Sequence, residues 1–313
     1  MRSLLVVAAI AALAAGCSSS SSSSSSSGGG KAASKSIGVS IQNQEAQFYQ
    51  DMGAGMKTQA AKYGYSVNIV DANRDNATQQ SQVEDFISQK VDAIVLTPYD
   101  SQAIGSAIAE ANRAGIPVFT ADIASTSKLG KVVSHVASDN VQGGAQAGLL
   151  ICASVKSGPV VIVDEPEVTS VQDRVKGFRQ ALAAHCPAVT VVADVDAGGQ
   201  RDKAANDVSD ILQSHPDIKG IFGINDDSAL GAVTALKSAG LNGKIAVVGY
   251  DAEPEARTAI ANGDMYGDAI QYPDQIGSKT IDVIHDYFSG KKPPAVVHIK
   301  VGSYTKANAA ATH

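Results

Sequence analysis

The strongest constraint on the fold is a repeated alternation of short β-rich runs with longer amphipathic, alanine-rich stretches. A first series has apolar runs at 37–41, 66–70, 93–97 and 117–120, separated by stretches with helical spacing at 47–63, 78–89 and 101–113. A second series has runs at 160–163, 189–193, 220–223 and 245–249, separated by 171–185, 203–214 and 228–239. Strands that alternate with helices predict parallel sheets covered on both faces.

Two series of similar length predict two doubly wound α/β domains with a cleft between them. We expect the break between the domains within 132–141, after the first series has used its strands. A late strand at 265–270 and the stretch 295–300 are placed to carry the chain back across. Ligands of open α/β sheets bind beyond the carboxyl ends of the strands, so the residues that follow each strand are the candidates for a site.

The N-terminal segment has the pattern of a lipoprotein leader. An uncharged apolar run from Leu4 to Ala15 is about a dozen residues long, shorter than the ~20 that a membrane-spanning helix needs. The run leads into Gly16 and Cys17, and a serine and glycine tract follows. We interpret 1–16 as a signal peptide, Cys17 as the lipidation site and 17–35 as a flexible tether, which predicts an exported protein anchored at the cell membrane. An ordinary secretory signal is the alternative.

Charge and cysteine content exclude several classes of partner. The formal net charge is −6 and the sequence has no basic stripe, which argues against a nucleic-acid surface or a polybasic membrane patch. After Cys17 only Cys152 and Cys186 remain. Two cysteines in an exported protein, without the paired spacing of metal ligands, favour one disulfide over a metal site. We expect no metal and no cofactor.

Polar and aromatic side chains gather after the expected strands. They are Gln42, Asn43, Glu45, Phe48 and Tyr49 after the first run, Asp122 after 117–120, Asn225, Asp226 and Asp227 after 220–223, Tyr250 and Asp251 after 245–249, and Gln271 after the late strand. Carboxylates and amides pair with hydroxyl groups, and aromatic faces cover the C–H patches of a sugar ring. The mixture is suited to a neutral, hydroxyl-rich small molecule.

Each of these residues also has a purely structural interpretation. Asp226 is expected to be the N-cap of the helix that follows it. Asn225 and Asp251 are both common turn residues, and for one of Phe48 and Tyr49 a place in the core of the helix is the expected interpretation.

Four motifs, in this order, give the chain a resemblance to a known family. They are Ser134-His135-Val136-Ala137-Ser138-Asp139-Asn140, Asn225-Asp226-Asp227-Ser228-Ala229-Leu230-Gly231, Val248-Gly249-Tyr250-Asp251 and Pro273-Asp274-Gln275-Ile276-Gly277. The body of the chain resembles the type I periplasmic sugar-binding proteins of ABC importers, which include the ribose binders. The resemblance implies two Rossmann-like lobes joined by three crossings and closing on a sugar. We place the first lobe at 36–136 and 272–299, the second at 137–271 and 300–306, and a disordered tail at 307–313.

The resemblance also implies a set of sugar contacts. They are Phe48, Tyr49 and Asp122 from the first lobe, Arg174, Asn225, Tyr250 and Asp251 from the second, and Gln271 at the hinge. Arg174 would alone be interpreted as a surface charge, but its place relative to Gly177-Phe178 matches the family's sugar-binding arginine. Gln42, Glu45 and Ile123 are further candidates for shaping the ligand.

The chain departs from the family's ribose binders at three places. Ile123 stands where they have an arginine after the first-lobe aspartate, and Ala46 stands where they have an asparagine. The loop 196–200 lacks their second stacking phenylalanine. We therefore expect a different pentose, a hexose or an open-chain polyol at least as readily as ribose.

The resulting interpretation is a monomeric, non-enzymatic substrate-binding lipoprotein that delivers a monosaccharide or polyol to an ABC permease. The alternative is a sensory protein that presents the sugar to a chemoreceptor or sensor kinase. A hydrolase using Asp122 and Asp251 as an acid/base pair is disfavoured, because no activated serine or cysteine nucleophile is visible. No helix-turn-helix precedes Ile37, which argues against a repressor.

Overall fold

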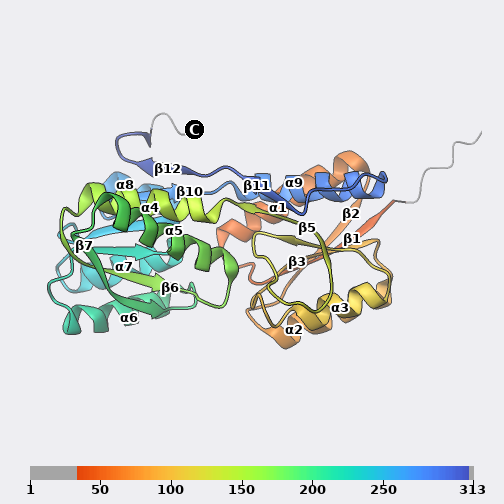
Figure 1. Ribbon diagram of the computed structural model, residues 1–313, viewed down its shortest axis with the longest axis horizontal. Coiled ribbons are helices and arrows are strands. Elements are labelled where there is room, and N and C mark those ends of the chain that lie inside the picture. The colour runs from red at the N-terminus through yellow and green to blue at the C-terminus, as the bar shows by residue number, and fades with distance from the viewer. Residues whose placement is uncertain (1–33, 310–313) are drawn as a thin grey trace, which may run out of the picture. The chain divides into compact units, whose positions relative to one another are not determined.

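Residues 34–309, described in a computed structural model, form two α/β lobes, each built on a six-stranded sheet (Figure 1). The prediction of two doubly wound lobes is confirmed. The predicted signal peptide, Cys17, the tether up to residue 33 and the tail at 310–313 lie outside the described residues. Within the described part, no helix combines the length and apolar character needed to cross a bilayer.

The sheet of the first lobe is entirely parallel. Its strands run in the order β11 (Val296–Ile299), β5 (Val132–Ser138), β4 (Val118–Ala121), β3 (Ala93–Thr97), β1 (Ser36–Ile41) and β2 (Ser66–Asp71). Its helices are α1 (Gln47–Tyr63), α2 (Asn76–Gln89), α3 (Gly105–Arg113) and α9 (Pro273–Phe288). In β3, Val95 packs into the cluster with α1 and α9, and Ile94 and Leu96 pack into the cluster with α2 and α3. Burial on both faces explains why this strand is apolar throughout.

The sheet of the second lobe is parallel except at one edge. Its strands run in the order β12 (Gly302–Thr305), β10 (Gly267–Ile270), β9 (Ala246–Asp251), β8 (Gly220–Gly223), β6 (Gly158–Asp164) and β7 (Val189–Asp196), and only β12 is antiparallel to its neighbour. Its helices are α4 (Asn140–Ser154), α5 (Thr169–His185), α6 (Arg201–Ser214), α7 (Asp226–Ser238) and α8 (Pro254–Asn262).

The chain passes from one sheet to the other three times. The passages lie between β5 and α4, between β10 and α9, and between β11 and β12. The lobe boundaries given above remain a prediction at the level of single residues. At the C-terminus, Asn308 accepts from the backbone N–H of Thr305 at 2.6 Å and donates to the Ser303 carbonyl at 2.9 Å. These hydrogen bonds involve one residue of the segment 307–313, for which disorder stays a prediction.

Several elements were not predicted. Strand β5 was overlooked because Ser134 and His135 interrupt its apolar run. The Ser134 hydroxyl donates to the carbonyl of Pro294 at 2.7 Å, and His135 Nδ1 lies 2.9 Å from the Thr120 hydroxyl. These partners satisfy the polar groups inside the sheet, so the strand tolerates them. Helices α8 and α9 and strand β12 were not predicted either.

Helices α4 and α5 pack closely, and a disulfide joins them. Cys152 on α4 and Cys186 at the end of α5 are bonded, with their Cα atoms 5.6 Å apart. A Cβ added to Gly144 would lie 1.9 Å from the Arg174 carbonyl oxygen, and one added to Gly177 would lie 2.0 Å from the Val141 carbonyl oxygen. Glycine at both positions therefore permits this close approach, which fixes the backbone of Arg174 against α4.

Candidate functional site

A cavity lies between the lobes, at the carboxyl ends of the parallel strands. It is lined by Gln42, Ala46, Phe48, Tyr49, Arg74, Asp122 and Ile123 from the first lobe, by Glu165, Val168, Ser170, Val171, Arg174 and Asn225 from the second, and by Gln271 at a crossing. This is the place where the strand-end rule predicts a ligand. The structure thus brings most of the predicted contacts to one cavity.

The first-lobe side of the cavity contains acceptors without a protein partner. Gln42 Nε2 donates to the Tyr49 hydroxyl, which in turn donates to Asp122 Oδ2 at 3.3 Å. Gln42 Oε1 and Asp122 Oδ1 are buried and make no hydrogen bond to any residue of 34–309. Burial raises the pKa of Asp122, and the nearby Arg174 opposes that shift. Unpaired buried acceptors are costly, so these two oxygens are suited to receive hydrogen bonds from a ligand.

The second-lobe side is organised around Arg174, whose side chain is only 5% exposed. Its Nε donates to Asn140 Oδ1 at 3.0 Å, and its Nη1 donates to the Ile224 carbonyl at 2.9 Å. The guanidinium lies 4.0 Å from the ring centre of Tyr250, and Nη1 lies 4.0 Å from Asp251 Oδ1. Arg174 is therefore a buried, pre-oriented donor rather than the surface charge that its sequence context alone suggested.

Tyr250 contacts Arg174 and Asn140 instead of lining the cavity. The residue is fully buried, and its hydroxyl donates to Asn140 Oδ1 at 3.1 Å, the same oxygen that receives Arg174 Nε. Its ring faces the guanidinium of Arg174. Tyr250 therefore positions Arg174, and the direct sugar contact that we expected of it stays a prediction.

Asn225, and not Asp226, caps helix α7, so this prediction was wrong. Asn225 Oδ1 accepts from the backbone N–H of Ser228 at 2.8 Å, and its Nδ2 donates to the Gly199 carbonyl at 3.2 Å. Asp226 instead points inward, where its Oδ2 accepts from the backbone N–H of Glu253 at 2.7 Å. The asparagine that lines the cavity thus also holds the start of α7.

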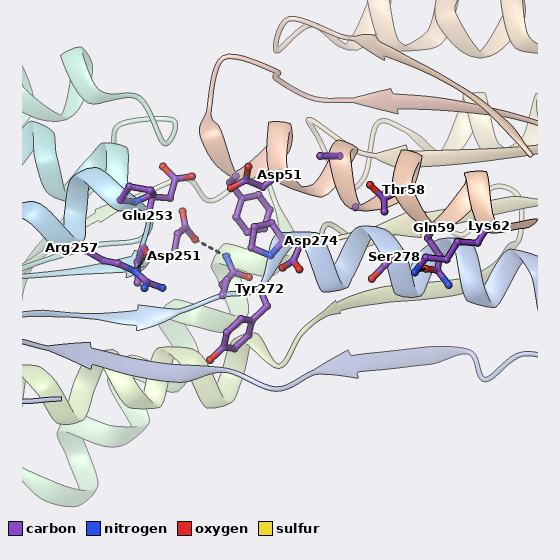
Figure 2. A pocket seen from close by; sticks show the side chains of 17 residues that line it. Asp51, Thr58, Gln59, Lys62, Asp251, Glu253, Arg257, Tyr272, Asp274 and Ser278 are labelled. Atoms are coloured by element: carbon purple, nitrogen blue, oxygen red, sulfur yellow. Dashed lines mark hydrogen bonds between the residues drawn. The ribbon is translucent and has the colours of Figure 1, made fainter. Parts of the chain in front are cut away.

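Asp251 and Gln271 lie on the hinge side. Gln271 Nε2 donates to Asp251 Oδ1 at 2.6 Å, while Gln271 Oε1 is buried and has no partner among the described residues. Figure 2 shows this bond at the edge of a second, more open hollow, which Asp51 on α1, Glu253 before α8 and Asp274 on α9 also line. Phe48 and Gln271 line both spaces and so form part of the wall between them.

Three polar residues of the site have backbones in the left-handed region. The φ angles are 54° at Arg74, 63° at Asp122 and 121° at Asp251. Such conformations are uncommon for residues other than glycine and are concentrated at functional sites.

Glu45 is the one predicted shaping residue that does not line the cavity. It lies instead along an open groove that residues of both lobes line, among them Tyr99 and Gln200. Two charged lining residues, Arg74 and Glu165, were not predicted. They follow the strands expected at 66–70 and 160–163, so applying the strand-end rule to every strand would have included them.

The lobes touch each other around the cavity. Arg74 Nη1 donates to the Gly198 carbonyl at 2.8 Å and lies 3.4 Å from Glu165 Oε1. The backbone N–H of Ser101 donates to the Glu167 carbonyl at 3.2 Å, across the same interface. These contacts define a closed arrangement of the two lobes.

A family match, two relatives and one solved structure all point to periplasmic binding proteins. Residues 37–292 match the family described as "Periplasmic binding protein domain". The chain is 35% identical over 265 residues to the ribose import binding protein of Salmonella typhimurium, which covers 84% of this chain and 88% of that protein. It is 33% identical over 241 residues to the xylitol-binding protein of Mycolicibacterium smegmatis, which covers 76% and 68%. A solute-binding protein from Agrobacterium vitis, solved with α-D-tagatopyranose, has a TM-score of 0.83 and 27% identity and covers 88% of this chain and 95% of its own.

Proposed function

The chain belongs to the type I periplasmic sugar-binding proteins, a family of non-enzymatic binding proteins, and we propose that it is the binding component of an ABC importer. It captures a monosaccharide or polyol between its lobes and delivers it to a membrane permease. The observation that carries this proposal is the interlobe cavity, which Gln42, Asp122 and Gln271, each with an unpaired acceptor, line together with the donor Arg174.

The proposed mechanism is closure of the two lobes about their three connections. A ligand hydroxyl that donates to Asp122 and accepts from Arg174 contacts both lobes at once, so it stabilises the closed arrangement more than the open one. The contacts of Arg74 and Ser101 with the second lobe add to that closed state.

Ribose is not expected to be the preferred ligand. Ile123 is buried in the cavity wall and cannot donate a hydrogen bond, so a ligand oxygen placed against it would remain unpaired. Calorimetric titration and thermal unfolding with ribose, xylose, fructose, glucose, xylitol and inositol test both claims, because a ligand of the folded state raises its stability. No binding in the whole panel would count against the proposed function, whereas ribose binding most tightly would overturn only the specificity.

Delivery to a permease is tested in the cell. Deleting the permease that the binding protein serves is expected to abolish uptake of the bound sugar, and deleting the binding protein is expected to do the same at low sugar concentration. If uptake persists without the binding protein while a response to the sugar is lost, the sensory alternative replaces the importer.

Cys17 is proposed to carry the lipid anchor. A Cys17→Ala variant should lose the anchor and be recovered in the soluble fraction, or fail to mature, because no thiol remains for lipid attachment. Fractionation of cells with an antibody to the folded part measures this outcome. Membrane association and normal maturation of the variant would contradict the anchor.

Sugar affinity is expected to rise as the pH falls from about 8.5 to about 5.5. In the closed state burial raises the pKa of both Glu165 and Glu253 to about 7, although Arg74 and Arg174 oppose the shift at Glu165 and a hydrogen bond from the Phe48 backbone opposes it at Glu253. In an open state water reaches both carboxyl groups, and their pKa returns toward 4.5. Closure therefore takes up protons. Because the pKa is higher in the closed state, that state is less stable relative to the open state above pH 7 and more stable below it.

The full pKa shifts would change Kd by about thirtyfold for each carboxyl group over that pH range, and solvent screening of the partly exposed Glu253 reduces the expected total change to about ten- to a hundredfold. Titration calorimetry in two buffers of different ionisation enthalpy measures this change. The double variant Glu165→Gln/Glu253→Gln should flatten the profile. Glu255→Gln is the matched control, since the side chain of Glu255 is 62% exposed and pairs with Arg201 on the surface. A flat profile in the wild-type protein would contradict the prediction.

A further inference from the structure

The side chains of Arg74 and Glu165 meet across the lobe interface at the mouth of the cavity. Arg74 lines the cavity and also the open groove that Asn43, Tyr99 and Gln200 line, so it stands where the two spaces join. The side chains of Arg74 and Glu165 are only 19% and 6% exposed. The two side chains come from opposite lobes and are shielded from solvent. They therefore form a pair at the ligand only when the lobes are closed.

Arg74 keeps hydrogen-bond donors that the protein does not use. Its two contacts, with the Gly198 carbonyl and with Glu165 Oε1, are both made by Nη1. Its Nε and Nη2 donate to no residue of 34–309. A guanidinium carries five N–H donors in a rigid fork, so an oriented donor edge remains for a ligand oxygen.

The loop after β7 is shaped to admit this pair. Gly198 and Gly199 have φ angles of +56° and +61°, which favour glycine. A Cβ at Gly199 would lie 2.6 Å from Glu165 Oε2 and 3.0 Å from Asn225 Nδ2. The loop therefore provides no side chain there, and the carboxylate of Glu165 and the amide of Asn225 occupy the space.

The chemistry of the remaining wall complements this pair. Gln42 Oε1, Asp122 Oδ1 and Gln271 Oε1 are unpaired acceptors, so each calls for a hydroxyl that donates. A hydroxyl that donates to one partner still has lone pairs that accept from another. Adjacent hydroxyls can thus accept from the free edge of Arg74 and donate to Glu165 at the same time.

We propose that Arg74 and Glu165 are specificity-determining ligand contacts that together recognise a vicinal diol of the sugar or polyol at the mouth of the cavity. The pair recognises a polar edge of the ligand, where a stacking ring would recognise a C–H face. This inference rests on the proposed function, because it concerns the same cavity and the same class of ligand.

The test is calorimetric titration of ribose, xylose, fructose, glucose, xylitol and inositol into the wild-type protein and into Arg74→Gln, Arg74→Lys and Glu165→Gln, all at pH 8. Arg74→Gln should weaken the tightest-binding probe by about 10- to 100-fold and should narrow the differences in affinity among the six probes. Arg74→Lys should recover part of the affinity without restoring the differences, because an ammonium lacks the fork. Glu165→Gln should also narrow the differences.

Gly199→Ala supplies a second variant, since its Cβ would lie 2.6 Å from Glu165 Oε2 and 3.0 Å from Asn225 Nδ2, and it should also narrow the differences in affinity among the six probes. Arg179→Gln on α5 is the matched control, because its ion pair with Asp194 at 2.6 Å is half exposed and outside the cavity. Thermal unfolding of every variant checks the fold. An equal loss of affinity for all six probes would show that the pair only holds the lobes together, and it would overturn the inference. Unchanged affinity in the variants would overturn it as well. Failure of the wild-type protein to bind any probe would overturn the proposed function and this inference with it.

Discussion

An Arg174→Ala variant is expected to bind its sugar or polyol about 30- to 1000-fold more weakly than the wild-type protein, which corresponds to ~2–4 kcal/mol. The guanidinium is buried and held from three sides, by Asn140, by the Ile224 carbonyl and by the ring of Tyr250. It therefore meets the ligand already oriented, with little conformational entropy left to lose on binding. Removing it leaves the nearby carboxyl groups of Asp122 and Asp251 without a cation.

The measurement is titration calorimetry with the tightest-binding member of the sugar panel, together with thermal unfolding. Arg179→Ala is the matched control on the same helix, because Arg179 is half exposed and pairs with Asp194. Asp251→Asn provides a second variant that keeps the shape of the side chain, and it should also weaken binding severely. If Arg174→Ala folds normally and binds as tightly as the wild type, the assignment of the second-lobe contacts is wrong.

The strand-end rule predicted the location of the interlobe cavity because it follows from topology alone. Strands β1, β4, β6 and β8 are parallel within their sheets, so the residues after them must gather at one edge. Asp122 and Asn225 were found in this way. Arg174 could not be found so, because it lies inside helix α5, five residues after its start.

One error in the predicted site concerns which way a side chain points. Asn225 and Asp226 are neighbours with equal capping ability, and only the fold decides that Asn225 reaches Ser228 while Asp226 turns toward Glu253. The direction of the Tyr250 side chain is likewise decided by the fold. Alternation along β9 places its ring beneath Arg174, and a sequence pattern gives no means to distinguish a residue that touches the ligand from one that supports such a residue.

The proposed contact of Arg74 bears on the departures that we expect from the family's ribose binders. Ile123 and the loop 196–200 would remove a charge and a ring, and Arg74 would supply a charge from a different strand end. Its backbone φ of 54° and its contact with the Gly198 carbonyl depend on two segments far apart in the sequence. Such a compensation becomes visible only when both lobes are folded and closed.

Removing the disulfide should have the largest effect on stability and little effect on the site. Cys152 and Cys186 are 34 residues apart, and closing a loop of that size restricts the unfolded chain by about 4 kcal/mol in the chain-entropy model. The double variant Cys152→Ser/Cys186→Ser should therefore unfold at a temperature about 8–15 °C lower. Its sugar affinity should stay within about twofold of the wild-type value, because the bridge joins the far ends of α4 and α5 while Arg174 and Asn140 lie near their starts.

Thermal unfolding without reductant and calorimetry measure the two effects, and mass spectrometry of the exported wild-type protein checks the bond itself. Two free thiols in that protein, or an unchanged unfolding temperature in the variant, would show that the bridge does not stabilise the fold.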